Sequence, residues 1–354
     1  MGGVFLGELQ PMYLVLEDGS CWEGFGPGIE VKGEVVFDTT PVGYPQAVSD
    51  PSFAGQIVVF AFPMIGNYGV DLERLESNKP WASGVVVTSM EKGAFEGPSF
   101  SEWLIENGVG WMKFVDTRRL VIHLRERGCL RGAMCLDKRK EIPLSQEEHP
   151  VKTVSTKEVI RLEGKRGPKI ALVDYGVKRN IVRELQKRDC TVIIFPHNTE
   201  AEEILREDPD GILLSNGPGD PSLLEAEIKT VGDLIGQKPI AGICLGMQIL
   251  ALAVGGMTEK LKYGHRGANH AVKDLISGKG LVTSQNHGYA VVESSLRGTG
   301  MIVTHVNLGD GSVEGIMHER LPIWGVQFHP EGSPGPLDYE CFFDKFVAST
   351  KGVL

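Results

Sequence analysis

Apolar and polar positions follow two different patterns in the two halves of the chain. From residue 12 to about 135, short apolar runs such as MYLVL, EVVF and IVVFAF are separated by glycine-rich turns, which is typical of strands. Helical periodicity occurs there at 100–107 and 117–127. This half therefore predicts a mixed α+β domain, a sheet with a few added helices.

After Pro168 the apolar runs KIALVD, TVIIF, GILLS and PIAGI alternate with helical segments. Near-continuously apolar strands that alternate with helices indicate a parallel sheet covered on both faces. Further strands follow residue 257, and helices are expected at 222–237 and 337–348. We predict an α/β domain over 169–354, with a mostly parallel sheet flanked by helices.

The predicted domain organisation is an N-terminal domain over 1–150, a linker over 151–168 and the α/β domain. The linker is predicted because the sequence is polar and has little sustained periodicity between residues 137 and 168. With 354 residues the chain has room for two hydrophobic cores.

Composition narrows the classes of function. The 36 basic and 46 acidic residues give a net charge of -10, which argues against a nucleic-acid partner. No apolar run reaches the roughly 18 residues that a membrane span needs, and the first residues lack a signal-peptide pattern. We therefore expect a cytoplasmic protein without membrane contact.

Metal and cofactor sites are not indicated by residue spacing. The six cysteines include no C-x-x-C pair, and no phosphate-binding G-x-x-x-x-G-K-[ST] loop occurs. Most histidines also lack metal-ligand spacing, and each is expected to be a surface or core residue: His123, His149, His197, His265, His270, His305 and His318. The expectation is no metal, cofactor or ATP site in this chain.

The turn around Cys244 is the strongest candidate for chemistry. Gly242-Ile243-Cys244-Leu245-Gly246 links an apolar strand to a Leu/Ile/Ala helix, and a residue at such a corner has a strained backbone that exposes its side chain. The start of the helix favours a thiolate over a thiol. Cys244 is thus a candidate nucleophile, the alternative being a structural cysteine beside a tight turn.

A cysteine nucleophile needs an oriented base, and His329-Pro330-Glu331 can supply one. On an extended chain, side chains two residues apart share a face about 6.6 Å apart, and Pro330 favours an extended His329. A carboxylate beside the imidazole fixes its tautomer and stabilises the imidazolium. The alternative is a surface His-Pro-Glu turn.

Other candidates lie near these residues in the predicted fold. A Gly217 or Gly219 amide, with that of Leu245, could form an oxyanion hole, although the glycines could simply close a turn. Gln248 is one helical turn after Cys244 and is either a substrate contact or a solvated residue. The polar run 286–289 interrupts an apolar stretch and could line a pocket.

These motifs carry a family resemblance. LSNGPGDP, GICLGMQ, SQNHGYAV and QFHPEGSPGP, in this order and spacing, resemble class I glutamine amidotransferases with a Cys-His-Glu triad, and residues 169–354 match throughout. The stretch KYGHRGANHAVKD and the first half, including GEVVFDTTPVGYPQAVSDPSF, are similar to the small, glutaminase subunits of carbamoyl-phosphate synthetases.

The resemblance implies roles for particular residues. Cys244 would be the nucleophile, His329 the general base and acid, and Glu331 the residue that orients it. Glutamine would be contacted by Ser52, Gly217, Gly219, Leu245, Gln248, Asn286, Gly288 and Tyr289. The chain departs from the usual pattern at Met247, where many bacterial relatives have histidine, and at Tyr289, where phenylalanine is frequent.

The resemblance also implies a partner. Ammonia from L-glutamine would pass to a large synthetase subunit that holds ATP and metal ions and makes carbamoyl phosphate from bicarbonate. Three alternatives stay open at this point: a glutaminase subunit of another synthetase, such as that for anthranilate or GMP, a non-catalytic scaffold of the same fold, and a cysteine peptidase.

Overall fold

A computed structural model describes residues 9–93, 97–139 and 149–352. The chain divides into two compact units, Met1–Glu147 and Glu148–Leu354. The division falls close to the end of the predicted N-terminal domain at residue 150. Each unit has its own sheet and its own apolar cores.

The first unit contains a seven-stranded mixed sheet with the order β2-β1-β9-β3-β4-β6-β8. Strands β3, β4, β6 and β8 run parallel, and the pairings among β2, β1, β9 and β3 are antiparallel. The strands are β1 (Gln10–Leu16), β2 (Cys21–Gly26), β3 (Val31–Asp38), β4 (Gln56–Phe60), β6 (Gly84–Val86), β8 (Gly110–Met112) and β9 (Leu130–Cys135). A small parallel pair, β5 (Met64–Ile65) and β7 (Ser89–Met90), lies outside this sheet.

Alternate residues of these strands enter two different cores. In β4, Val58 and Phe60 pack with helix α2 (Phe100–Glu106), whereas Ile57 and Val59 pack with helix α3 (Thr117–Arg127). The two predicted helices are confirmed, and the mixed α+β class follows. The unit also has the short helices α1 (Tyr44–Ser49), η1 (Pro51–Phe53) and η2 (Leu72–Arg74).

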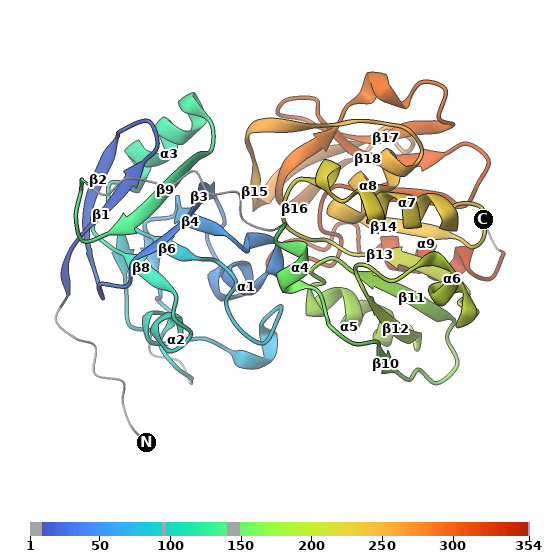
Figure 1. The fold of residues 1–354 in the computed structure, drawn as a ribbon, viewed down its shortest axis with the longest axis horizontal. Coiled ribbons are helices and arrows are strands. Elements are labelled where there is room, and N and C mark those ends of the chain that lie inside the picture. Colours follow the sequence, from blue (N-terminus) through green and yellow to red (C-terminus); the bar gives the residue numbers. More distant parts are fainter. Residues whose placement is uncertain (1–8, 94–96, 140–148, 353–354) are drawn as a thin grey trace. The chain divides into compact units, whose positions relative to one another are not determined.

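The second unit contains a ten-stranded sheet with the order β10-β12-β11-β13-β14-β19-β18-β17-β15-β16 (Figure 1). Five neighbouring strands are parallel: β12 (Thr191–Pro196), β11 (Lys169–Asp174), β13 (Gly211–Leu214), β14 (Ile240–Ile243) and β19 (Ile323–Val326). Antiparallel strands extend the sheet: β10 (Ile160–Leu162), β15 (Thr258–Asp274), β16 (Gly280–Val291), β17 (Met301–Asn307) and β18 (Val313–His318). The predicted α/β class is confirmed, and its parallel part is the one that carries Cys244.

Helices cover both faces of the parallel strands. In β11, Ala171 and Val173 face a core shared with helices α6, α7 and α8, and Ile170 and Leu172 face a core shared with α5 and α9. Figure 1 shows α7 and α8 side by side on one face. The helices are α5 (Arg179–Lys187), α6 (Ala201–Arg206), α7 (Glu225–Leu234), α8 (Leu245–Ala253) and α9 (Cys341–Ser349), with short helices α4 (Val151–Val154), η3 (Pro221–Leu223) and η4 (Glu293–Leu296).

Some predicted boundaries differ from the structure. The segment 151–168, predicted as a linker, carries α4 and β10, and β10 pairs with β12 at the edge of the sheet. A three-residue edge strand with exposed residues has too short an apolar pattern to detect. The helix predicted at 222–237 is divided into η3 and α7, and the last helix begins at Cys341 rather than residue 337.

None of the helices in the described parts of the chain combines the length and apolar character that crossing a membrane requires.

Candidate functional site

Cys244 occupies a strained corner between β14 and α8. Its φ of 53° and ψ of -108° lie in a region that side-chain-bearing residues rarely adopt, as the G-x-C-x-G pattern predicted. Its amide donates to the carbonyl oxygen of Val326 at 2.8 Å, so the corner is fixed to the end of β19. The thiol, only 2% of whose residue is exposed, therefore has one defined position.

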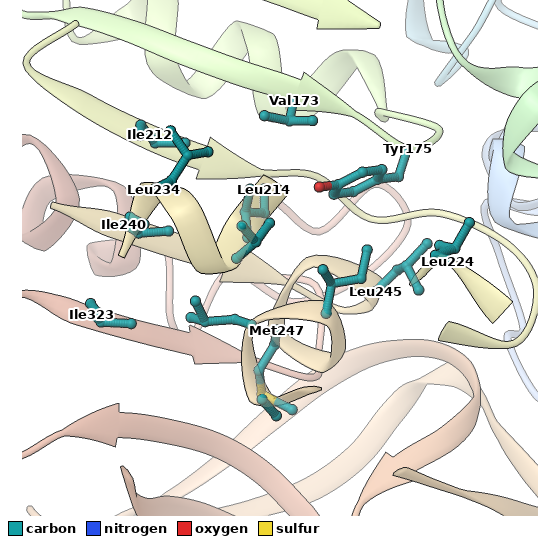
Figure 2. Packing of buried hydrophobic residues seen from close by; sticks show 14 of the residues in the cluster. Val173, Tyr175, Ile212, Leu214, Leu224, Leu234, Ile240, Leu245, Met247 and Ile323 are labelled. Carbon is teal, nitrogen blue, oxygen red and sulfur yellow. The ribbon is translucent and has the colours of Figure 1, made fainter. Parts of the chain in front are cut away.

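The glycines on either side of Cys244 permit this corner. A Cβ on Gly246 would lie 2.3 Å from the carbonyl oxygen of Leu214 in β13, and a Cβ on Gly242 would lie 2.6 Å from the backbone of Gly246. Both contacts are shorter than any side chain tolerates. The helix consequently starts directly against the neighbouring strand, where its apolar residues Leu245 and Met247 pack into the core (Figure 2).

His329 and Glu331 are adjacent, but not on an extended segment as we predicted. His329 makes an isolated bridge to Ser284, and Pro330 and Glu331 then form a turn in which the Gly332 amide donates to the His329 carbonyl at 3.2 Å. Proline suits the second position of such a turn, and Gly332 has a φ of 61°. The turn closes the expected gap of about 6.6 Å, and His329 Nδ1 lies 2.6 Å from Glu331 Oε1.

Three strands of the sheet bring Cys244 and His329 together. The Cys244 thiol donates to the Asn286 carbonyl in β16 at 3.7 Å, and the His329 amide donates to the Ser284 carbonyl in the same strand at 2.9 Å. The Cys244 thiol also acts as a hydrogen-bond partner that raises the pKa of His329. The nucleophile and base predicted from separate motifs thus share one site.

The orientation of the His329 ring follows from its neighbours. A carboxylate only accepts, so Nδ1 carries the proton that Glu331 binds. Nε2 is buried without a partner of good hydrogen-bond geometry within the described part of the chain. It is therefore the nitrogen available to exchange a proton with the thiol.

Lys178 is a site residue that the sequence reasoning missed. Its side chain is 2% exposed, and its Nζ lies 2.9 Å from Glu331 Oε1 and donates to the Gly332 carbonyl at 2.6 Å. It follows the carboxyl end of β11, the edge at which chemistry gathers in such sheets. That rule was the available signal, although the sequence alone does not show that this lysine turns inward.

These charges set the protonation states of the pair. Burial alone would raise the pKa of Glu331, but the Lys178 ammonium and His329 outweigh it and hold that pKa well below its usual range. Burial alone would lower the pKa of His329, but the Glu331 carboxylate outweighs it and raises that pKa. The site therefore favours an ionised Glu331 and a strongly basic imidazole.

Replacing Lys178 with methionine should destabilise the second unit by about 3–5 kcal/mol, because Glu331 would remain buried without its ammonium partner. Urea unfolding measures this change. Lys187→Met is the matched control: Lys187 pairs with Glu184 at an exposed position and should matter by at most about 1 kcal/mol. Equal effects of the two substitutions would contradict the role given to Lys178.

The predicted oxyanion residues lie beside Cys244. Gly217 packs so closely that a Cβ would be 2.8 Å from Leu245 Cδ2 and 2.3 Å from the Tyr175 carbonyl oxygen. The Leu245 amide is in the first turn of α8, where no preceding helical carbonyl can accept from it. Gly219 has a φ of 94°, and its own position carries no contact to Cys244 that would test its role.

Gln248 and the polar run of β16 are joined by hydrogen bonds. The Gln248 side-chain nitrogen donates to the Tyr289 carbonyl at 2.8 Å and to Gln327 Oε1 at 2.9 Å, so this residue is buried rather than solvated. Asn286 accepts from the thiol, and Gly288 passes close to the Arg266 guanidinium. Their predicted contacts with glutamine remain predictions.

Two further positions fall outside this cluster. Ser52 lies in η1 of the first unit, where its amide donates to Asp50 Oδ1 at 2.9 Å, and its contact with glutamine stays a prediction. Met247 is fully buried, and a Cβ on Gly325 would lie 2.7 Å from it. The departure at Met247 therefore affects packing between α8 and β19.

Comparison with known proteins gives two family matches and a large set of relatives. The model of class I glutamine amidotransferases matches residues 171–349, and that of the carbamoyl-phosphate synthase small chain matches residues 14–134. A carbamoyl phosphate synthase small chain from Bacillus cereus is 48% identical over 94% of both chains. The small chain from Clostridium acetobutylicum is 44% identical over 94% of this chain and 98% of its own.

Among solved structures, a GMP synthase subunit from Thermoplasma acidophilum is 25% identical. The similarity covers 53% of this chain and 96% of that chain, with a TM-score of 0.47.

Proposed function

This chain belongs to the family of carbamoyl-phosphate synthase small chains, and from that premise we propose that it is a glutaminase subunit that hydrolyses L-glutamine through a thioester on Cys244. The observation that carries the proposal is the meeting of Cys244 with the buried His329–Glu331 pair. Each part alone has a structural explanation, whereas a strained cysteine beside an oriented imidazole is the arrangement that nucleophilic catalysis requires.

In the first half of the reaction, His329 Nε2 takes the thiol proton and the Cys244 sulfur attacks the side-chain carbonyl carbon of glutamine. The carbonyl oxygen becomes an oxyanion, which the Leu245 amide and a Gly217 or Gly219 amide stabilise; one such donor is typically worth about 3–4 kcal/mol. When the tetrahedral intermediate collapses, the C–N bond breaks and His329 donates its proton to the departing ammonia.

In the second half, His329 removes a proton from water, which attacks the glutamyl thioester. The C–S bond breaks, glutamate leaves, and the thiol recovers a proton. Glu331 keeps the ring in the tautomer that both halves need, since its bond to Nδ1 directs Nε2 to the sulfur. Lys178 holds Glu331 ionised and in place.

We further propose that the ammonia passes to a large synthetase subunit, which holds ATP and metal ions and makes carbamoyl phosphate for pyrimidine and arginine biosynthesis in the cytoplasm. The first family match supports the glutaminase role and the second supports the choice of synthetase, because it covers the N-terminal half. Ser52, Gln248, Asn286, Gly288 and Tyr289 complete the proposed glutamine site.

The test is hydrolysis of L-glutamine by the purified full-length chain, alone and with a carbamoyl-phosphate synthase large subunit. We expect equal amounts of glutamate and ammonia, a faster rate with the large subunit, and no cleavage of peptides. Absence of hydrolysis in both preparations would favour a non-catalytic scaffold, and peptide cleavage would favour a cysteine peptidase.

A further inference from the structure

A second cluster of titratable side chains lies in the antiparallel part of the same sheet. His265 in β15 and His287 in β16 are direct partners in the register of the two strands, and Glu314 in β18 joins them. All three residues are buried, with Glu314 fully so. His287 directly follows Asn286, yet neither histidine has a role in the proposed glutaminase reaction.

Hydrogen bonds outside the cluster place the ring protons. His287 Nδ1 lies 2.7 Å from the Tyr289 carbonyl oxygen, which only accepts, so Nδ1 carries the proton and Nε2 presents a lone pair. His265 Nε2 lies 2.9 Å from Asp310 Oδ2, so in the neutral ring Nε2 carries the proton and Nδ1 presents a lone pair. The two lone pairs face each other across 3.2 Å, and such a contact needs a cation between them.

The three donor atoms have the spacing of a metal site. His265 Nδ1 and Glu314 Oε1 are 3.5 Å apart, and His287 Nε2 and Glu314 Oε1 are 4.0 Å apart. A triangle with these sides and the 3.2 Å edge has a point about 2.1 Å from all three atoms, which matches the usual zinc–nitrogen and zinc–oxygen distances.

Each donor also has a supporting residue. Asp310 holds His265 in the carboxylate–histidine arrangement that is typical of metal-binding histidines. Asn307 Nδ2 donates to Glu314 Oε1 at 2.9 Å, and Gln285 Nε2 donates to Glu314 Oε2 at 2.8 Å. These bonds fix the carboxylate in the orientation that faces both rings.

We propose that His265, His287 and Glu314 bind one Zn²⁺ ion. Two imidazoles and a carboxylate form a ligand set known for zinc, and three protein ligands leave a fourth position for water. The ion would cross-link β15, β16 and β18, three strands that are distant in sequence. Asp310 is 42% exposed, so the cluster lies one side chain below the surface and can be reached from solvent.

This site departs from our expectation that the chain holds no metal. The two histidines are separated by 22 residues, and only the antiparallel register places them opposite each other. The competing explanation is a proton in place of the ion, carried by His265 and shared with His287 and the two carboxylates.

The test uses the full-length chain, stripped of metal with a chelator and titrated with Zn²⁺ and, separately, with Co²⁺, whose visible absorption reports the ligand geometry. We expect one ion per chain and the intense visible bands of a four-coordinate cobalt site. Asp310→Asn should weaken Zn²⁺ affinity about 10–100-fold, because Asp310 orients a ligand without binding the ion. Glu314→Gln removes a ligand and should weaken the affinity further.

His197→Asn is the matched control, since His197 pairs with Glu227 at 2.6 Å in the same unit but has no second histidine ligand. It should leave the zinc stoichiometry and affinity unchanged. The proposal is overturned if the wild-type chain binds much less than one ion, or if Asp310→Asn and the control bind zinc equally. Because Asp310→Asn alters only an exposed turn, a failure of Glu314→Gln to fold does not remove the test.

Discussion

Replacing Cys244 with serine should lower the rate of glutamine hydrolysis by at least about 10⁴-fold. The serine hydroxyl is far less acidic than a thiol, and no other residue at the β14–α8 corner can form the thioester. Glutamate release by the complex with a large subunit measures the loss. Synthesis of carbamoyl phosphate from added ammonia should be retained, because that reaction does not use Cys244.

Cys341→Ser is the control for this substitution, since Cys341 is an exposed thiol in the same unit. It should hydrolyse glutamine at the wild-type rate. Retention of wild-type hydrolysis by Cys244→Ser would exclude Cys244 as the nucleophile, whereas loss of the ammonia-dependent reaction as well would indicate a damaged complex instead.

Replacing His329 with asparagine should lower kcat/KM for glutamine about 10²–10⁴-fold, which is the usual contribution of a general base. Asparagine leaves the buried Lys178–Glu331 pair intact, so the fold should persist. Alkylation of Cys244 by iodoacetamide at neutral pH should also slow, because the imidazolium no longer stabilises a thiolate beside it.

His197→Asn again provides the control, because His197 forms a similar 2.6 Å pair with a glutamate but lies apart from the thiol. Its kcat/KM and alkylation rate should match those of the wild-type chain. If His329→Asn lowers kcat/KM but leaves alkylation unchanged, the histidine would act after the attack and would not be the base that activates Cys244.

The parts of this fold that depend on local patterns could be predicted from the sequence. The alternation of apolar strands and helices after residue 168 identifies the parallel sheet, and the two glycines identify the strained corner at Cys244. These features could be predicted because a few neighbouring residues determine each of them. The edge strand β10 has only three residues and no such pattern, which is why its segment was predicted as a linker.

The parts that depend on strand register could not be predicted in this way. Lys178 reaches Glu331 across 153 positions of sequence, and His265 meets His287 only because β15 and β16 pair as they do. The spacing of His329 and Glu331 indicated the correct pair but the wrong backbone, because Gly332 closes a turn that the extended-chain argument did not include. Long-range pairing, rather than residue type, is therefore what the sequence pattern lacks.

The most direct test of the account is labelling with a diazoketone analogue of L-glutamine, followed by peptide mapping. The analogue enters as a substrate and leaves a stable bond on the attacking atom. We predict one adduct per chain, on Cys244, formed in proportion to the loss of glutaminase activity and prevented by excess glutamine. Complete inactivation with an unmodified Cys244, or an adduct on another residue, would contradict the account.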